Sequence, residues 1–353
     1  MNYKPHSKID LKSLSPDQID LLCTQELGQK HGQGLRIAKW LYRRGVENFD
    51  DMEDVNKPFR EQLKRRCSIS TLMIEKMRLS EDSTVKLLYR LSDNNTIEGV
   101  LIPGRNRLTL CVSSQVGCAA GCAFCMTGAG GFVRNLTVPE IVNQVFAATK
   151  STVVPITNIV LMGTGEPLNN YNSVKSFVEI TTDRNGMGFS PRKVTISTCG
   201  LAPAIEQLAN DRLDVSLAVS LNATTDALRD RIMPVNKTYP IARLIEAMRY
   251  YCDKTDRSVT IEYVLLKDLN DTVADVKRLM DLLKGLPCMI NILLFNPFPG
   301  CRYERPDTQR ALSMRDMLVE NGYVTVVRNS RGHDIHAACG QLKASTGTSR
   351  KAF

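Results

Sequence analysis

Three cysteines, Cys118, Cys122 and Cys125, stand close together with the spacing C-x3-C-x2-C. They lie in a stretch rich in glycine and alanine, so their thiolates can converge on one soft metal centre. A closed structural zinc site needs four nearby Cys or His ligands, usually as two C-x2-C pairs, and no second pair or nearby histidine follows here. Three thiolates instead suit a [4Fe-4S] cluster that keeps one iron open for a substrate. The alternative is three buried structural thiols, but protein cores rarely place three cysteines on a glycine-rich loop.

The length and composition suit a soluble enzyme with one large α/β domain and a smaller one. The 353 residues are 43% hydrophobic, and no apolar run approaches the ~18 residues that a membrane span needs. The N-terminus does not resemble a signal peptide, and eleven cysteines without an export signal indicate a reducing compartment. We therefore expect a cytoplasmic protein that does not enter a membrane. The net charge of +9 is compatible with a polyanionic partner but is weak evidence alone.

The first ~75 residues have the pattern of a helical module. A capping box at 15–18 opens a helix that should stop at Gly28. We expect a second helix over about 34–44 and a third from Asn56 to residue 66. Between residues 30 and 66, ten Lys and Arg outnumber six Asp and Glu, so this surface either contacts RNA or is a solvated basic face. The cations expected to contact RNA include Arg43, Arg44 and Arg65.

Residues 84–112 change to the pattern of β-strands. Two runs, 84–91 and 96–102, flank the turn sequence Ser-Asp-Asn-Asn and predict a hairpin. Glu98 lies inside the second run among apolar neighbours. Most glutamates in such a position face solvent, whereas one directed into a pocket has a raised pKa and can exchange protons near neutral pH.

From Cys111 onward, strand and helix patterns alternate. This alternation predicts a parallel sheet curled into a partial (β/α) barrel, with functional residues clustered where the strands end. The strands are expected at 158–162, 193–197, 215–221, 259–266, 289–295 and 323–328.

Polar side chains do follow several of these strands. Gly163-Thr-Gly-Glu-Pro167 directly follows the first one. Its two glycines allow the backbone to approach a ligand closely, and Glu166 can hold an ammonium group, although the pattern alone is often only a tight turn. Any one polar residue at the other strand ends could be a turn or capping residue, but together they form a ring of candidate ligand contacts. These residues are Ser197, Ser220, Asn222 and Asn296.

Two further cysteines, Cys111 and Cys339, lie outside the C-x3-C-x2-C motif. Cys339 follows the last strand, and a thiol on a flexible loop near Arg328 and Arg331 could have a lowered pKa and act as a nucleophile. An incidental small hydrophobic residue is the alternative for Cys339. The remaining cysteines are interpreted as structural: Cys23, Cys67, Cys199, Cys252, Cys288 and Cys301.

Four motifs together resemble the RlmN family of radical S-adenosylmethionine (SAM) enzymes. They are the stretch from Cys111 to Cys125, Gly163-x-Gly-Glu-Pro-Leu168, Asn296-Pro-Phe-Pro-Gly300 and Arg331-Gly-x-Asp-Ile-x-Ala-Ala-Cys-Gly-Gln-Leu342. The resemblance covers nearly the whole chain, and the last motif is especially specific because ordinary radical SAM proteins lack it.

The resemblance implies an α/β fold with a radical SAM partial (β/α)6-type barrel. The barrel, with a C-terminal catalytic loop, would occupy residues 111–342. It would be preceded by a helical RNA-binding domain (1–75) and a β-hairpin linker (76–110), and followed by a basic, disordered tail (343–353).

Members of this family methylate carbon 2 of adenine in the peptidyl transferase centre of 23S rRNA and in tRNA. By resemblance, Cys339 first takes a methyl group from one SAM. A second SAM, bound at the open iron, is cleaved to a 5′-deoxyadenosyl radical that removes hydrogen from this methyl, and the carbon radical adds to the adenine. Cys111 then resolves the adduct by forming a transient disulfide with Cys339. Glu98 matches the family's proton acceptor, although Cys111 could take the proton itself.

The same resemblance implies the remaining ligands and partners. Asn222 departs from the histidine that many members carry, and because asparagine does not titrate near pH 7, we expect SAM binding with altered tuning. Partners would be 23S rRNA, tRNA and an electron donor such as flavodoxin or ferredoxin, and the chain would be a monomer. The cluster ligands would be Cys118, Cys122 and Cys125. The SAM-binding residues would be Gly165, Glu166, Ser197, Ser220, Leu221, Asn222 and Asn296.

Three alternatives remain open. Cfr-type enzymes methylate carbon 8 of adenine, but they carry alanine where Pro167 stands. A radical SAM enzyme acting on protein or a small molecule would not need the basic helices or the Cys111/Cys339 pair. A non-enzymatic Fe–S sensor would not need the Gly-Glu-Pro loop.

Overall fold

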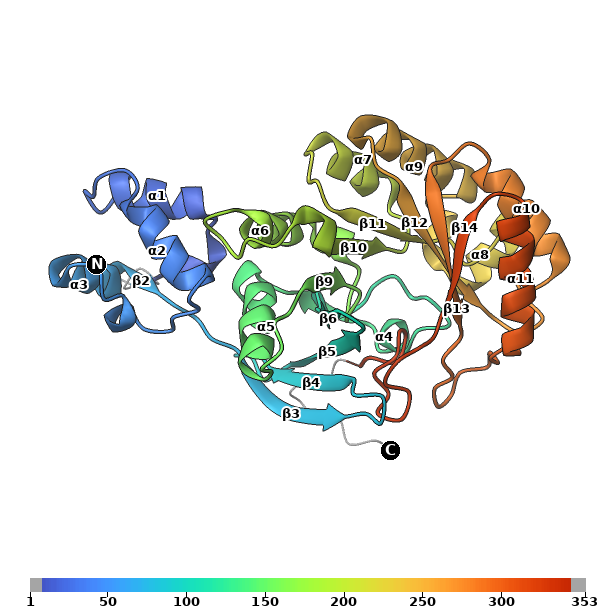
Figure 1. Ribbon diagram of the computed structural model, residues 1–353, viewed down its shortest axis with the longest axis horizontal. Helices are drawn as coiled ribbons and strands as arrows, with labels where there is room; N and C mark the ends of the chain where they lie inside the picture. Colours follow the sequence, from blue (N-terminus) through green and yellow to red (C-terminus); the bar gives the residue numbers. More distant parts are fainter. Residues whose placement is uncertain (1–7, 344–353) are drawn as a thin grey trace, which may run out of the picture.

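The computed structural model of the chain describes residues 8–343. A helical module lies at one end of the molecule, and β-strands join it to a curved sheet with helices packed along its outer side (Figure 1). The tail expected over 343–353 falls outside the described residues, except for Lys343.

The N-terminal module contains the three short α-helices that the sequence predicts, together with a small parallel pair of strands, β1 (Ile9–Asp10) and β2 (Cys67–Ser68). The helices are α1 (Pro16–Gln25), α2 (Gln33–Tyr42) and α3 (Lys57–Arg66). The capping box of α1 is complete, because Gln18 N donates to Ser15 Oγ (3.3 Å) and Ser15 N donates to Gln18 Oε1 (2.8 Å).

Basic side chains attach this module to the rest of the molecule. The buried Lys12 donates to Asn143 Oδ1 (2.7 Å) on α5 (Val138–Lys150). Arg43 donates to the carbonyl of Arg184 (2.9 Å), which follows α6 (Tyr171–Thr182). Arg43 therefore makes a structural contact that was not predicted from the sequence.

Ten strands form one sheet in the order β14-β13-β12-β11-β10-β9-β6-β5-β4-β3. Strands β3 to β6 pair antiparallel, and β6 and β9 to β14 pair parallel, so the expected hairpin continues the barrel sheet. The antiparallel strands are β3 (Met73–Leu79), β4 (Val85–Arg90), β5 (Thr96–Gly104) and β6 (Arg107–Cys111). The others are β9 (Asn158–Leu161), β10 (Val194–Thr198), β11 (Ser216–Ser220), β12 (Val259–Leu265), β13 (Cys288–Leu294) and β14 (Val324–Arg328).

The sheet is a partial barrel, because β3 and β14 are its two edges and do not pair with each other. All six strands expected after Cys111 are present, and the α/β partial-barrel architecture predicted from the sequence is confirmed. Alternate strand residues such as Ile196, Val219 and Ile261 join the outer helices in one apolar core. These helices are α5, α6, α7 (Ala202–Asn210), α9 (Ile241–Thr255), α10 (Val273–Leu283) and α11 (Thr308–Glu320).

Among residues 8–343, no helix is both long and apolar enough to cross a bilayer.

Candidate active site

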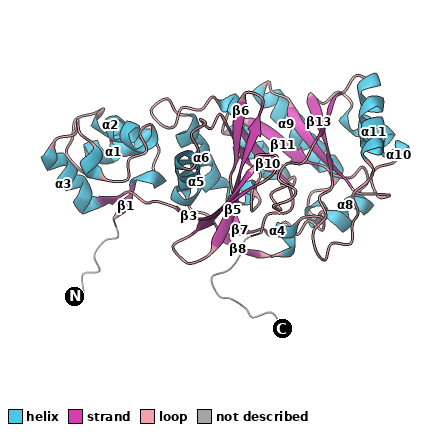
Figure 2. Ribbon diagram, turned by 60° about the horizontal axis from the view of Figure 1, so that its bottom comes forward, coloured by secondary structure: helices cyan, strands magenta, loops and turns pink. Residues whose placement is uncertain are grey.

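The three clustered cysteines lie on a loop that a small hairpin holds in place. Strands β7 (Gln115–Gly117) and β8 (Phe132–Asn135) pair antiparallel and enclose the loop and the short helix α4 (Met126–Ala129). These elements lie together below the sheet in the view of Figure 2.

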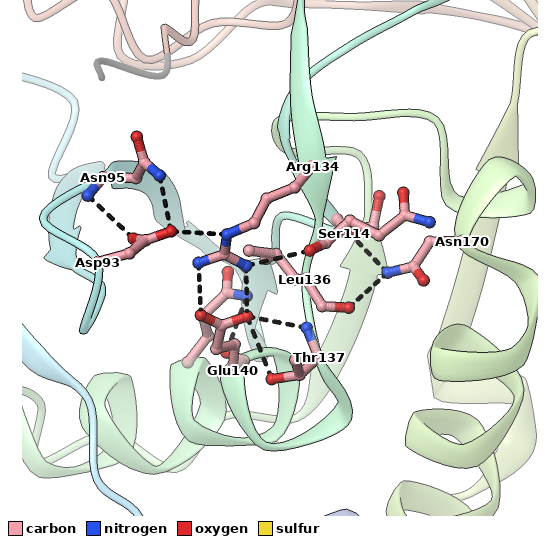
Figure 3. A network of polar contacts seen from close by, with 10 residues as sticks. Asp93, Asn95, Ser114, Arg134, Leu136, Thr137, Glu140 and Asn170 are labelled. Carbon is pink, nitrogen blue, oxygen red and sulfur yellow. Dashed lines mark hydrogen bonds and ion pairs between the residues drawn. The ribbon is translucent and has the colours of Figure 1, made fainter. Parts of the chain in front are cut away.

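Arg134 on β8 ties this hairpin to its surroundings. Its guanidinium pairs with Asp93 (2.7 Å), in the turn between β4 and β5, and with Glu140 (2.8 Å), in the first turn of α5 (Figure 3). The same Glu140 carboxylate completes the capping box with Thr137, accepting from its backbone N at 2.8 Å. Asn170 donates to the carbonyls of Ser114 (2.9 Å) and Leu136 (2.7 Å), on either side of the hairpin. The cysteine loop is thus positioned by charged and amide contacts at its base.

The cysteine thiols lie close enough to influence one another. Burial, followed by the charges of Cys125 and Cys118, raises the pKa of Cys122, and burial raises the pKa of Cys118 to about 12. Within residues 8–343, however, no three His, Cys, Asp or Glu side chains converge on a position for a single metal ion. A cubane cluster differs, because each thiolate binds a different iron atom and the sulfurs stand apart. The N–H of Ala120 donates to Cys118 Sγ (3.5 Å), a contact that also suits a cluster thiolate.

The Gly-Thr-Gly-Glu loop after β9 packs against the strand that leads into the cysteine loop. A Cβ on Gly163 would lie 2.6 Å from the carbonyl oxygen of Val112, and one on Gly165 would lie 2.6 Å from Gln115 Cβ. Both glycines are therefore required by neighbouring protein, and the close approach of their backbone to a ligand stays a prediction. Their packing nevertheless fixes the position of the next residue, Glu166.

Glu166 is a buried carboxylate whose two oxygens accept backbone N–H groups. Oε1 accepts from Leu168 N (3.0 Å), and Oε2 accepts from Cys199 N (2.7 Å), at the end of β10. Burial raises the pKa of this carboxyl, and its negative charge in turn raises those of Cys118 and Cys122. No Lys or Arg pairs with Glu166 in the described part of the chain. A buried carboxylate without a cation beside the cysteine loop is a suitable partner for an ammonium group.

Ser197 and Ser220 face the inside of the barrel. They lie on the face opposite to the core residues Ile196 and Val219, and both are half-buried. Ser220 pairs in register with Glu262 on β12, another buried carboxyl group, which accepts from Asn291 Nδ2 (2.8 Å).

Arg229 organises the ends of β10 and β11, and no sequence motif pointed to it. It is fully buried on α8 (Asp226–Ile232) and donates to the carbonyls of Cys199 (2.8 Å), Ser220 (3.1 Å) and Leu221 (3.0 Å). Its charge opposes, without overcoming, the rise that burial causes in the pKa of Cys122. Cys199, interpreted from the sequence as structural, thus lies between Arg229, Glu166 and the cysteine loop.

Asn222 and Asn296 hold protein segments as well as being candidate ligand contacts. Asn222 adopts a left-handed backbone (φ 57°) and its Oδ1 accepts from Val264 N (2.8 Å). Asn296, after β13, donates to the carbonyl of Cys339 (3.0 Å). Asn296 therefore positions the loop that carries Cys339.

The segment around Cys339 is fastened on two sides, contrary to the expected flexible loop. On the side of the cysteine loop, Met126 N donates to Gly340 O (2.7 Å) and Thr127 Oγ1 donates to Leu342 O (2.6 Å). On the side of the antiparallel strands, the segment makes three hydrogen bonds. Gly332 N donates to Asp82 Oδ2 (2.9 Å), and Lys343 N donates to Glu98 Oε2 (2.8 Å). Lys86 Nζ donates to the carbonyl of His336 (3.0 Å).

Cys111 and Cys339 meet at this segment. Cys111 is buried and packs with Ala337 and Leu342, which flank Cys339 in the chain. Burial, followed by the charge of Cys339, raises the pKa of Cys111. Residues 228 positions apart are thus brought into one cluster.

The lowered pKa expected for Cys339 is wrong. Its side chain has an exposed surface, but protein surrounds it on most sides, and the loss of solvation raises the pKa of the thiol. Glu262 adds to the increase, and Arg328 opposes it. The arginine that suggested a reactive thiolate is therefore outweighed.

Glu98 does not face solvent, and both oxygens of its carboxylate have protein partners. It is buried on β5 and lines a cavity, and its Oε1 pairs with Lys86 Nζ at 2.8 Å. With the N–H of Lys343 on the other oxygen, its carboxylate already holds both a cation and the end of the Cys339 segment.

Comparison with known proteins gives matches over both parts of the chain. Residues 9–69 match the ribosomal RNA large subunit methyltransferase N-terminal domain, and residues 112–283 match the radical SAM superfamily. A curated relative, the dual-specificity RNA methyltransferase RlmN of Pelobacter propionicus, is 44% identical over 98% of this chain and 98% of its own. The chain belongs to the RlmN family.

A second curated relative and a solved structure agree with this assignment. The relative from Geobacter sulfurreducens is 46% identical, over 95% of this chain and 92% of its own. The crystal structure of a radical SAM methyltransferase from Sphaerobacter thermophilus superposes with a TM-score of 0.87 at 39% identity, covering 95% of this chain and 99% of that one.

RlmN-type enzymes use a [4Fe-4S] cluster and SAM, and the side chains of this member suit both. The three thiols on one positioned loop provide three ligands, and the N–H of Ala120 already faces one sulfur. The uncompensated carboxylate of Glu166, next to those thiols, provides a partner for the amino group of SAM. Once such a ligand is bound, the buried charge of Glu166 is no longer unpaired.

Proposed function

We propose that this SAM-dependent RNA methyltransferase adds a methyl group to carbon 2 of adenine in 23S rRNA and tRNA. The target positions would be adenine 2503 of the rRNA and adenine 37 of the tRNA. The observation that carries this proposal is the meeting of Cys111 with the Cys339 segment beside the cysteine loop. A radical SAM enzyme that only cleaves SAM needs the cysteine loop but has no use for two further thiols in this arrangement.

In this proposal, Cys118, Cys122 and Cys125 would hold the cluster, which would supply the electron that cleaves SAM to methionine and a 5′-deoxyadenosyl radical. Glu166 binds the amino group of SAM, and the remaining contacts come from the strand ends. These contacts are Gly165, Ser197, Ser220, Leu221, Asn222 and Asn296. Glu166, Ser220 and Leu221 are all linked by hydrogen bonds through Cys199 and Arg229. The groups that contact SAM would therefore be held in position before SAM binds.

Cys339 would carry the methyl group, since its side chain is the accessible one of the two special thiols. Its sulfur loses a proton and takes the methyl of SAM, so the product of loading is a thioether. Because burial raises the pKa of this thiol, the thiolate is the minor form at neutral pH, and loading requires a group that takes up the thiol proton. Once the methylene group on Cys339 is bonded to the adenine, the Cys111 thiolate would attack the sulfur of Cys339 and break its bond to the methylene carbon. That carbon would take the electron pair and a proton to become the methyl group of the released RNA, and a Cys111–Cys339 disulfide would remain.

Glu98 remains a candidate for the group that accepts the carbon 2 proton, with Cys111 as the alternative. We propose that the enzyme acts as a monomer in the cytoplasm, with a flavodoxin or ferredoxin as its electron donor.

Mass spectrometry of the purified protein tests the proposal directly. A methyl group on Cys339 is expected, and 2-methyladenosine should be missing from the rRNA and tRNA of a strain that lacks the gene. An unmethylated Cys339 in active enzyme would contradict the carrier role. 8-Methyladenosine in place of 2-methyladenosine would instead indicate the Cfr-type reaction.

A further inference from the structure

A cationic cavity lies on the antiparallel half of the sheet. It has a volume of about 110 Å³ and is lined by Lys76 and Arg78 of β3, Lys86 and Leu88 of β4 and Glu98 of β5. Strand register explains the grouping, because Lys76 pairs with Leu88, Arg78 with Lys86, and Leu88 with Glu98. All of these side chains therefore point to one face of the sheet.

This face continues into the thiol cluster. Val100 follows Glu98 by two residues on the same face of β5, pairs with Cys111 on β6, and packs with Ala337 and Leu342. Two strand spacings separate β3 from β5, which is about 10 Å. A group bound at Lys76 and Arg78 and a base at Cys339 can thus belong to one short segment of RNA.

The charges in the cavity are not balanced. Lys86 is neutralised by Glu98 at 2.8 Å, and the second oxygen of Glu98 is occupied by Lys343 N. Lys76 and Arg78 are exposed and have no hydrogen bond or ion pair with any residue between 8 and 343. By contrast, Arg90 on the neighbouring strand is paired with Glu75 (2.6 Å). Two free cations in a concave site provide a double positive charge and a planar fork of donors, which suits a phosphodiester.

We propose that Lys76 and Arg78 bind a backbone phosphate of the RNA substrate next to the target adenosine. This inference rests on the proposed function and adds a specific subsite to it. An adenine that leaves its stack to reach Cys339 brings its flanking phosphates toward the protein, and the cavity lies beside that path. The contact is to the backbone, so it contributes affinity and orientation without reading sequence.

The test is the double variant Lys76→Gln/Arg78→Gln, whose changes lie on an exposed edge strand. Binding of a fluorescent RNA hairpin containing the target adenine is measured by anisotropy over a range of salt concentrations. We expect affinity to fall about tenfold at low salt and the salt slope to decrease by about 1 to 2. Iron content, SAM cleavage without RNA and the methyl on Cys339 should stay at wild-type levels.

The matched control is Arg192→Gln/Lys193→Gln. These two exposed cations precede β10, at the opposite end of the parallel strands, and the variant loses the same charge. Equal losses of RNA affinity in the two variants would overturn the subsite, as would wild-type binding by Lys76→Gln/Arg78→Gln. The second result would indicate that the charges serve only to keep the sheet edge from pairing.

Two further outcomes separate this inference from others. If inorganic phosphate binds the wild-type protein but not the double variant, while both proteins bind the RNA hairpin with equal affinity, the cavity is a site for free anions and the RNA assignment is wrong. If the wild-type protein neither binds the hairpin nor carries a methyl on Cys339, the proposed function itself fails.

Discussion

The parallel strands β9 to β14 and the antiparallel strands β3 to β6 contribute to the site in different ways. In the parallel half, candidate residues follow the ends of strands, because parallel strands all finish at the same edge. In the antiparallel half, they lie on the face of the sheet, with Glu98 near the start of β5 and Cys111 at the end of β6. We therefore expect the parallel half to serve SAM and the antiparallel half to serve methyl transfer and RNA.

The Cys339 segment is the part that joins the two halves. It is bonded to the cysteine loop through Gly340 and Leu342, and to the antiparallel strands through Gly332, His336 and Lys343. A thiol in this segment can reach both halves, as is required of a group that takes a methyl from SAM and transfers it to RNA. If the two halves have separate roles, variants in one should leave the other intact.

The largest effect is expected in the cysteine loop. Replacing any one of Cys118, Cys122 or Cys125 by alanine should remove most of the bound iron and all SAM cleavage, because two thiolates hold a cubane poorly. Iron analysis after anaerobic reconstitution, together with detection of 5′-deoxyadenosine, measures both. Full iron and turnover in any of the three variants would refute the assignment.

The two special thiols should separate transfer from cleavage. Cys339→Ala removes the methyl carrier, so no methyl is loaded and no RNA adduct forms. Cys111→Ala keeps loading and addition but lacks the thiol that resolves the adduct, so protein joined to RNA through Cys339 should accumulate. Denaturing gels with labelled RNA show the difference. Identical behaviour of the two variants, with no protein–RNA adduct in either, would refute the two-thiol mechanism.

Arg229→Met should damage the parallel half by destabilising it. The change leaves the buried carbonyls of Cys199, Ser220 and Leu221 without their donor, which should cost about 3 kcal/mol or more in the free energy of unfolding. Arg231→Met, on the same helix but exposed, should change it by less than about 0.5 kcal/mol. Denaturant unfolding of both variants measures the difference, and similar values would mean that Arg229 does not support the strand ends.

Asn222 allows a smaller and more specific test. Asn222→Gly removes the hydrogen bond to Val264 N and should cost about 1–3 kcal/mol. Asn222→Ala removes the same bond and should lower the free energy of unfolding by about 1–2 kcal/mol more than Asn222→Gly, because alanine is unfavourable at φ 57°. Equal unfolding free energies for these two variants would show that the left-handed backbone is not retained.

The smallest effect concerns the N-terminal module. Arg43 bonds to Arg184 O and Arg44 lies over the Trp40 ring at 3.8 Å, so reversing either charge would also break a protein contact. Lys39→Gln combined with Arg65→Gln is the cleaner variant, since both side chains are exposed. If the module contacts RNA, the salt slope of binding should fall by about 1 to 2 while SAM cleavage is unchanged. An unaltered slope would identify a merely solvated basic face.

The local elements could be predicted because their signals are local. The capping boxes at Ser15 and Thr137 and the six strand runs require only residues that are neighbours in the chain, and each is present. The spacing of Cys118, Cys122 and Cys125 likewise brings three thiols onto one loop without any tertiary information. The order of parallel strands follows from their succession, since consecutive strands pair as neighbours.

Only the tertiary structure decided how the distant parts act on one another. The pKa of Cys339 depends on the balance between burial, Glu262 and Arg328, and this balance reversed the shift expected from the arginines alone. Arg229 is an ordinary helix residue by sequence, yet it joins two strand ends, and Glu98 is paired with Lys86 only because of strand register. Motif spacing therefore determined which groups could carry the chemistry. Their protonation, pairing and accessibility arise from burial and from contacts between residues up to 250 positions apart, which no local pattern encodes.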